Sequence, residues 1–291
     1  MPDIASRAKL WFVISLLVIV PGLISMFTRG FNFGIDFTGG TILDLKFDSP
    51  VQIATVRDAL RPFGLDNATI QLSGDSADIS ASNSVMIRTV DLEESQRKVI
   101  MSAIRSNVAN FEVLREEKVG ATIGSELISN ALLALVISWA LIILYIAYRF
   151  EFRFGFAAIL ALIHDILIVL AVFSFTQKQI DSSFVAALLT IVGYSINDTI
   201  VIFDRIRENL KLHFKRRGNL ADIVNRAIFQ TLTRSLYTVL TCIFTSLSLL
   251  YFGGDTTKDF AFALTIGFIC GCYSSIFIAG PLWLTFKNMS K

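Results

Sequence analysis

The chain is short of charged residues and of cysteines. Asp, Glu, Lys and Arg make up only 17% of its 291 residues, below the share of about a quarter that is usual for soluble proteins. Its three cysteines, Cys242, Cys270 and Cys272, all fall within apolar runs. We therefore expect them to be packing residues and to form neither a disulfide framework nor a metal site. The low charge argues against an ordinary soluble protein.

The motifs of common soluble enzymes are also missing. The sequence has no glycine-rich phosphate loop, no CxxC pair and no HExxH motif. The GYSIN run at Gly193–Asn197 lies inside an apolar window, so it does not predict the strand–turn–helix nucleophile elbow of a hydrolase. We expect no active site of its own, no cofactor and no nucleic-acid partner.

Apolar residues are abundant, at 54%, and they gather in long runs. A bilayer core requires about 20 apolar residues per helical span, so such runs predict membrane helices. Six windows qualify, at Leu10–Phe27, Ile128–Tyr148, Phe154–Phe175, Phe184–Phe203, Leu236–Phe252 and Phe260–Phe286. No small-x-small cleavage site follows the first window, so we expect a retained anchor. The predicted fold class is a polytopic α-helical membrane protein with six transmembrane helices.

Basic residues are shared unevenly between the connections of these windows. One alternating set, which includes both termini, holds Arg7, Lys9, Arg149, Arg153, Arg205, Arg207, Lys211, Lys215, Arg216, Arg217, Lys287 and Lys291. The short loops of the other set carry only Lys178 and Lys258. The positive-inside rule therefore predicts cytoplasmic N- and C-termini and an extracytoplasmic segment between the first two helices.

This orientation predicts three parts. Residues 1–30 hold the cytoplasmic N-terminus and the first helix, residues 31–125 form an extracytoplasmic domain, and residues 126–291 form a five-helix membrane domain with a basic cytoplasmic loop at 204–235. The basic residues of this loop are expected to determine the topology and to contact lipid headgroups. The alternative is that they form a docking surface for a cytosolic partner.

The extracytoplasmic segment is expected to fold as a compact α+β domain. Alternating or β-rich runs predict strands at Thr41–Phe47, Ala68–Ser73, Ser84–Val90 and Phe111–Arg115. Ser49 and Pro50 are suited to open a helix that ends before Gly64, and Asp91 and Glu94 have capping-box spacing before a helix reaching about Ala109. The order βαββαβ predicts a split-βαβ or ferredoxin-like unit.

Asp198 is the most informative polar residue. A carboxylate in the middle of a membrane helix costs about 2.5–3.5 kcal/mol on insertion scales, so it normally faces a bundle interior or a water path. Asp198 borders a polar stripe made of Thr190, Asn197 and Asp204, and we expect it to face protein. A structural hydrogen bond between helices is the alternative to proton carrying.

Other polar residues accompany the apolar windows. Asp165 lies near the middle of the third window, where proton handling is expected, and its neighbour His164 is either a hydrogen-bonded residue or a relay. Arg234 precedes the fifth window, where snorkelling to the headgroups is the simpler explanation.

Two helix faces carry small side chains. Ser235, Thr238, Thr241, Thr245 and Ser248 form a ladder of hydroxyl groups that packs helices or lines a hydrated path. Gly267, Gly271 and Ser275, spaced four apart, predict close helix packing.

Several of these segments resemble the SecF protein-export family. The resemblance is carried by FGIDFTGGT at Phe33–Thr41, VGATIGSEL at Val119–Leu127, VGYSINDTIVIFDRIREN at Val192–Asn209, TLTRS at Thr231–Ser235 and the His164–Asp165 pair. It extends over essentially the whole chain in the same order. Ala121 departs from it, because the family often has proline there.

The resemblance implies a function in the bacterial inner membrane. SecF pairs with SecD within the resistance–nodulation–division superfamily, and together they use the proton-motive force to promote preprotein export through the SecYEG channel. By this resemblance, protons are the coupling ion, Asp198 accepts and releases the proton, and Arg234 stabilises the anion. The turn at Asp36, Gly39 and Gly40 becomes an extracytoplasmic hinge, because adjacent glycines permit positive φ angles.

Two other function classes compete with this one. A half-transporter for small molecules or lipids fits the superfamily, but such exporters usually carry two halves with large substrate domains. A scaffold without an ion role predicts that Asp198 can become Asn without functional loss.

Overall fold

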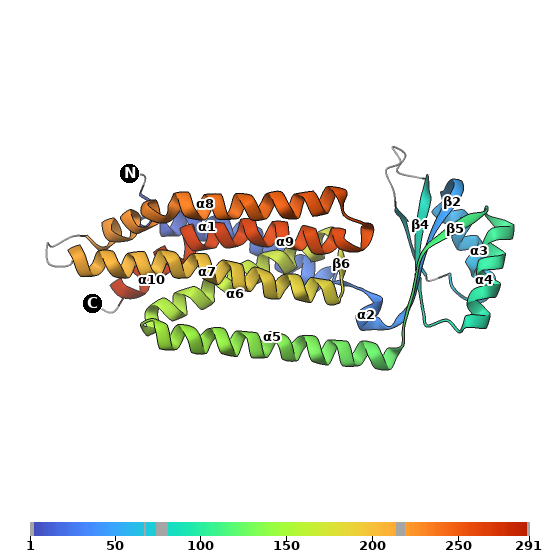
Figure 1. The fold of residues 1–291 in the computed structure, drawn as a ribbon, viewed down its shortest axis with the longest axis horizontal. Helices are drawn as coiled ribbons and strands as arrows, with labels where there is room; N and C mark the ends of the chain where they lie inside the picture. Colours follow the sequence, from blue (N-terminus) through green and yellow to red (C-terminus); the bar gives the residue numbers. More distant parts are fainter. Residues whose placement is uncertain (1–2, 67, 74–80, 214–218, 290–291) are drawn as a thin grey trace. The chain divides into compact units, whose positions relative to one another are not determined.

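The computed structural model describes residues 3–66, 68–73, 81–213 and 219–289. The chain divides into two compact units, which we call the helical unit (Met1–Asn32 and Leu132–Lys291) and the α/β unit (Phe33–Ala131). The basic residues Lys215, Arg216, Arg217 and Lys291 lie outside the described residues, as do residues 74–80 between the predicted strands Ala68–Ser73 and Ser84–Val90. Figure 1 shows the elements of both units along the chain.

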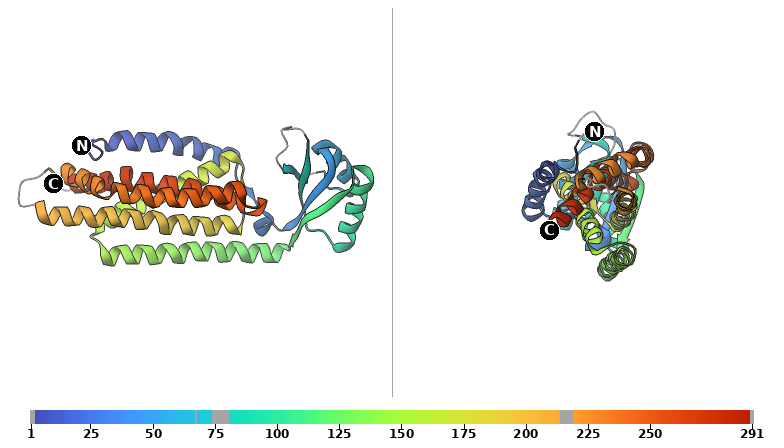
Figure 2. Two further views of the ribbon diagram at one scale, coloured as in Figure 1. Left: turned by 45° about the horizontal axis from the view of Figure 1, so that its top comes forward. Right: turned by 90° about the vertical axis from the view of Figure 1, so that its left-hand side faces the viewer.

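Six helices in the described part of the chain are long and apolar enough to cross a membrane, which confirms the predicted number. The first five are α1 (Ala8–Thr28), α5 (Ala121–Arg149), α6 (Phe152–Thr176), α7 (Ser182–His213) and α8 (Leu220–Phe252). The sixth is formed by α9 (Asp255–Ser274) and α10 (Gly280–Asn288) together. In the helical unit these helices run alongside one another, as Figure 2 shows in two further views.

The last membrane helix forms the centre of the helical unit. α9 packs against α6, α7 and α8, and 72% of its membrane-length window is buried, against 17% for α1 and α8 and none for α5. Small and polar residues on a membrane helix allow other helices to pack closely against it. Residues on α9 therefore reach all three of its neighbours.

This helix is not uniform, although the sequence predicts one uninterrupted window. A π-helical turn, η3 (Ser275–Ala279), separates α9 from α10. Pro281 follows directly and has no N–H to donate to the preceding turn, so the regular hydrogen-bond pattern cannot continue through it. Single π turns of this kind are frequent at functional sites.

The α/β unit contains a four-stranded antiparallel sheet. Its main elements are β2 (Gly40–Gln52), α3 (Ile53–Leu60), β3 (Thr69–Ser73), β4 (Ala81–Thr89), α4 (Glu94–Asn107) and β5 (Phe111–Val119), and the sheet order is β3-β4-β2-β5. The helices α3 and α4 lie on one face of this sheet (Figure 1). Between helices and sheet lies a core that includes Leu43, Leu45, Val56, Ile87 and Ile104.

Two helix starts in this unit differ from the prediction. Strand β2 continues past Pro50 to Gln52, because an irregularity between Lys46 and Val51 lets the chain resume pairing with β4 beyond the proline. The capping box of α4 is formed by Glu93 and Gln96, two residues after the predicted pair Asp91 and Glu94. Asp91 instead forms an ion pair with Lys118 on β5, at 2.8 Å.

Short elements complete the chain. They are β1 (Asn32–Phe33), α2 (Ile35–Thr38), the 3-10 turn η1 (Arg61–Phe63) and β6 (Gln179–Ile180).

Candidate functional site

Asp198 lies on α7 and faces the interior of the helical unit. Its side chain is 8% exposed, and Ser235 on α8 donates a hydrogen bond to its Oδ1 at 2.6 Å. The second oxygen, Oδ2, is buried without a hydrogen-bond partner among the described residues. A buried carboxylate oxygen without a partner is costly, so this group is incompletely satisfied and well suited to carry a proton.

The polar stripe beside Asp198 points elsewhere. Thr190 and Asn197 are exposed in this chain, and Asp204 is half-buried in ion pairs with Arg149 and Arg207. Consecutive residues on a helix point about 100° apart, so Asp198 can face inward while Asn197 faces outward.

Arg234 stands on α8 next to Ser235, and its side chain is exposed. The direct hydrogen bond to the Asp198 carboxylate comes from its neighbour Ser235. Arg234 also lines a polar cavity of about 240 Å³ together with Asp204, Arg205 and Gln230. Thr231 and Val201 line it too, so the cavity begins about one helical turn from Asp198.

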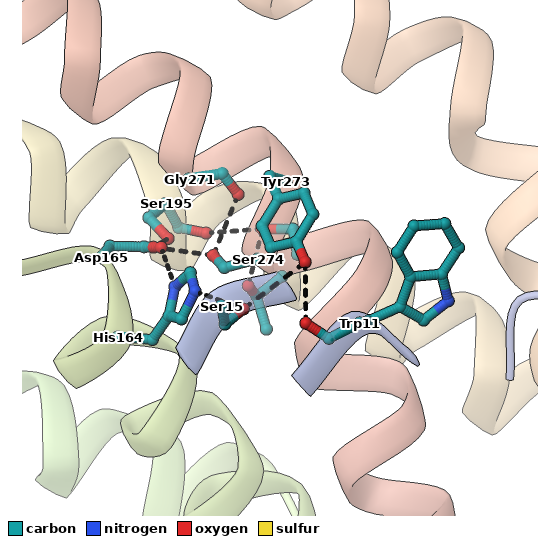
Figure 3. A network of polar contacts seen from close by, with 10 residues as sticks. Trp11, Ser15, His164, Asp165, Ser195, Gly271, Tyr273 and Ser274 are labelled. Atoms are coloured by element: carbon teal, nitrogen blue, oxygen red, sulfur yellow. Dashed lines mark hydrogen bonds and ion pairs between the residues drawn. The ribbon is translucent and has the colours of Figure 1, made fainter. Parts of the chain in front are cut away.

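Asp165 on α6 has a different environment, shown in Figure 3. It is 1% exposed, and its Oδ2 accepts hydrogen bonds from Ser195 on α7 at 2.6 Å and from Ser274 on α9 at 2.7 Å. Its Oδ1 lies 3.0 Å from Nδ1 of His164. Both oxygens are therefore occupied, by groups from three helices.

His164 extends this network to α1 (Figure 3). Its Nε2 lies 2.9 Å from the hydroxyl of Ser15, and its ring stacks on that of Tyr273 on α9. The Tyr273 hydroxyl donates to the backbone carbonyl of Trp11 at 3.0 Å. Sequence reasoning singled out His164 and Asp165 but missed Ser15, Ser195, Tyr273 and Ser274, because such residues are ordinary in membrane helices.

The small residues of the last helix pack against α7 in register. A Cβ added to Gly267 would overlap Ile191, one added to Gly271 would lie 3.1 Å from Cβ of Ser195, and the hydroxyl of Ser275 lies 2.8 Å from that of Thr199. The three contacts repeat every four residues on both helices. This close approach brings Ser195 and Ser274 together at Asp165.

In the α/β unit, Asp36, Gly39 and Gly40 form the turn between α2 and β2. Gly39 and Gly40 have φ angles of 70° and 133°, which disfavour any residue with a Cβ. A Cβ on Gly40 would also overlap the backbone oxygen of Thr89. Gly124, at the start of α5, lies against this turn, since a Cβ there would be 3.3 Å from the oxygen of Asp36. The turn is therefore sterically constrained.

Metal-ligating side chains do not cluster in the part of the chain that the structure describes, where no group of three or more His, Cys, Asp or Glu could hold an ion. The polar groups of the candidate site are hydroxyls, the carboxylates of Asp165 and Asp198, and the imidazole of His164.

Comparisons with known proteins agree on one family. Family models for the SecD/SecF GG motif and for the C-terminal region of the protein export membrane proteins SecD/SecF match residues 24–51 and 99–289. Protein translocase subunit SecF of Acidaminococcus fermentans is 49% identical over 289 residues, which cover 99% of this chain and 98% of that protein.

A longer relative matches as well. Protein translocase subunit SecDF of Thermus thermophilus is 40% identical over 266 residues, covering 91% of this chain but only 36% of that protein. The crystal structure of SecDF from the same organism, described as a translocon-associated membrane protein, superimposes with a TM-score of 0.88 at 38% identity, covering 98% of this chain and 38% of that chain.

Proposed function

The chain belongs to the SecF family of protein translocase subunits, and from that premise we propose that it pairs with SecD and uses the proton-motive force to promote preprotein export through SecYEG. It is a multi-pass membrane protein, and we place it in the bacterial inner membrane with both termini in the cytoplasm. That orientation follows from the basic residues of the connections.

The observation that carries the proton role is the unpartnered oxygen of Asp198. Ser235 satisfies only one of its two oxygens, and an ionised carboxylate this deep in a membrane helix is costly without a cation or water. The polar cavity that begins one turn away supplies a route for water, and Arg234 on its wall supplies the cation. Asp198 then binds and releases the proton while Arg234 stabilises its anionic form. Asp165 contributes from the neighbouring helix.

Two exposed helix faces, on α8 and α5, support SecD as a partner. The hydroxyl ladder of α8 includes Thr238, Thr241, Thr245 and Ser248, which are exposed in this chain, and polar side chains in membrane helices normally face other helices. The membrane-length window of α5 has no buried residue. In the relative named SecDF, the matching segment belongs to a chain almost three times as long. We propose that these faces pack against SecD.

We further propose that the α/β unit is an extracytoplasmic domain with a ferredoxin-like fold, corresponding to residues 31–125. Its βαββαβ order and the sheet order β3-β4-β2-β5 support this fold. The turn at Asp36, Gly39 and Gly40 is the hinge that connects it to α1, and the translocating preprotein is its partner.

Proton-driven translocation into membrane vesicles tests the central proposal. Vesicles that contain SecYEG and SecD receive either this chain or its Asp198→Asn variant, and export of a preprotein is measured with and without a proton-motive force. Asn keeps the shape of the side chain but cannot titrate, so we expect the proton-dependent part of export to disappear.

The control is Asp222→Asn, which removes an exposed carboxylate in the first turn of α8 and should leave export unchanged. Expression and association with SecD are measured for both variants. Full export with Asp198→Asn would make the chain a scaffold without an ion role and end the proposal.

A further inference from the structure

The hydrogen bonds around His164 have a direction that can be followed from one end. The chain of contacts ends at the backbone carbonyl of Trp11, which can only accept. The Tyr273 hydroxyl must therefore give its single hydrogen to that carbonyl. Its oxygen remains able to accept, and the hydroxyl of Ser15 donates to it at 3.4 Å.

Ser15 has only one hydrogen as well. Because that hydrogen points to Tyr273, the Ser15 oxygen must accept at its 2.9 Å contact with Nε2 of His164. Nε2 therefore carries a hydrogen. The tautomer of a histidine follows from such partners, and here it is assigned by them.

A second hydrogen lies on the other side of the ring. Nδ1 of His164 and Oδ1 of Asp165 are 3.0 Å apart, which requires one hydrogen between them. Oδ2 already accepts from Ser195 and Ser274. Whether the shared hydrogen sits on nitrogen or oxygen, the pair formed by His164 and Asp165, which we call the dyad, has a net charge of zero.

Burial gives the same result independently. His164 and Asp165 are 7% and 1% exposed, and a net negative charge at such depth would be costly without a partner cation. The groups that face the dyad from α9 are the Tyr273 phenol and the Cys270 thiol. Those from α1 and α7 are the hydroxyls of Ser15 and Ser195, with Asp198 about one turn further along α7.

We propose that the dyad is a second proton-binding site, loaded with one proton in this structure, and that Ser15 and Tyr273 are positioning residues that transmit its charge state to α1. For its part in transport, this inference rests on the proposed proton coupling. The chemistry of the dyad itself does not.

Loss of the proton changes one link of the network. When water accepts a proton from the dyad, its net charge falls from zero to −1, and the one remaining ring hydrogen stays on Nδ1 to serve the carboxylate. Nε2 then presents a lone pair, so the Ser15 hydroxyl turns to donate to it and leaves Tyr273. The Ser15–Tyr273 contact is the longest of the chain, and it is the one that opens. Opening this contact removes a hydrogen bond between α1 and α9. In the sequence, α1 is the helix that leads to the Gly39–Gly40 turn of the α/β unit.

Nitrogen NMR of His164 tests the inference directly. The chain has two histidines, so His213→Gln leaves a single 15N-labelled imidazole in the full chain, reconstituted with SecD in lipid. At neutral pH we expect Nε2 to carry a hydrogen. In Tyr273→Phe, Ser15 loses its acceptor and donates to Nε2, so the dyad should release one proton to water. Nε2 should then lose its hydrogen, and the one remaining hydrogen stays between Nδ1 and Oδ1.

A matched control is Tyr251→Phe, which removes an exposed hydroxyl from the far end of α8 and should leave the spectrum unchanged. An unprotonated Nε2 in the parent, or an identical spectrum after Tyr273→Phe, would overturn the proposal. A histidine that only packs would show no such change.

Export measurements separate this inference from the function proposed above. Tyr273→Phe should shift the pH profile of proton-driven export without lowering its maximum, because it alters protonation and leaves Asp198 in place. A uniform loss at every pH would reduce Tyr273 to packing and reject its positioning role. If Asp198→Asn exports normally while the nitrogen spectra behave as expected, the proton-coupling function fails and the dyad assignment stands.

Discussion

Asp165 and Asp198 lie on adjacent helices of one bundle, yet their carboxylates differ in how many hydrogen bonds they accept. Asp165 has both oxygens occupied, by Ser195, Ser274 and His164. Asp198 has a single donor, Ser235, and one buried oxygen without a partner in the described chain. A fully bonded carboxylate holds helices together, whereas an incompletely bonded one is free to change its protonation at small structural cost.

The difference also concerns access to water. Asp198 stands about one turn from a polar cavity, while a proton that leaves Asp165 must pass through the hydroxyls and the imidazole bonded to it. The tasks proposed for the two sites differ accordingly. Asp198 exchanges its proton with water in the cavity, and the dyad passes its charge state to α1. Each of the following variants tests this contrast.

Stability should separate the two carboxylates most strongly. Asp165→Ala leaves Ser195 and His164 without their acceptor and removes one of the two acceptors of Ser274, so we expect a loss of about 2–5 kcal/mol in the free energy of unfolding. Asp198→Ala removes one hydrogen bond and should cost about 1 kcal/mol or less. Unfolding of the full chain in mixed micelles by titration with denaturing detergent measures both. Equal losses would erase the distinction.

A variant in the Gly39–Gly40 turn keeps both carboxylates and tests whether the proposed hinge is needed for export. Gly40→Val places a β-branched residue at φ 133° against the Thr89 oxygen, and such strain costs about 1–3 kcal/mol or more. We expect impaired export with normal membrane insertion. Gly64→Ala is the matched control, since Gly64 also has a positive φ but has nothing within 4 Å of an added Cβ. Normal export with Gly40→Val would remove the turn from the mechanism.

Arg234 sharpens the role of Asp198 alone. Arg234→Met removes the cation proposed to stabilise the anion, and pairs with an exposed partner are worth about 0.2–1 kcal/mol, so export should fall by up to about fivefold. Combining it with Asp198→Asn should be no worse than the latter alone, because residues that act as a unit are not additive. Vesicle assays of both single variants and the double variant decide this. Strictly additive losses would mean that the two residues act independently.

The smallest effect is expected at a third carboxylate, outside the membrane helices. Asn225 of α8 and Ser6 donate hydrogen bonds to Asp3, which lowers its pKa below the usual 3.8. A lowered pKa means that the attachment is fully present above pH 3.8 and is lost as the pH falls through the lowered value. Ile4 and Ala5 also donate to Asn225, at 3.0 and 2.8 Å. Their amide hydrogen exchange, corrected for intrinsic rates, should rise only at the acid end, and Asp3→Asn should abolish that dependence.

The membrane helices and the polar residue Asp198 within them are predictable from the sequence, because local composition determines both. Runs of about 20 apolar residues predict membrane helices whatever their neighbours, and a carboxylate such as Asp198 stands out in such a run. The contrast with Asp165 is not predictable in this way. It depends on the rotation of four helices, which brings Ser15, Ser195 and Ser274 to one point from distant parts of the chain.

Local rules fail in two informative places. Asp198 borders the polar stripe that contains its neighbour Asn197, but only contacts between helices decide which of the two faces inward. The start of α3 after Pro50 follows from strand pairing across the sheet, which overrides the local helix signal at Ser49.

The hydroxyl ladder of α8 bears on how such a protein is made. Thr238, Thr241, Thr245 and Ser248 each donate their hydrogen to a carbonyl of their own helix, at 2.8 to 3.0 Å. None of these four hydroxyls leaves its hydrogen unbonded, so this face of α8 can lie against lipid before another helix packs on it. The oxygens keep lone pairs, which a later-arriving helix can use. For the proposed pairing with SecD, this means that the two chains need not be inserted together.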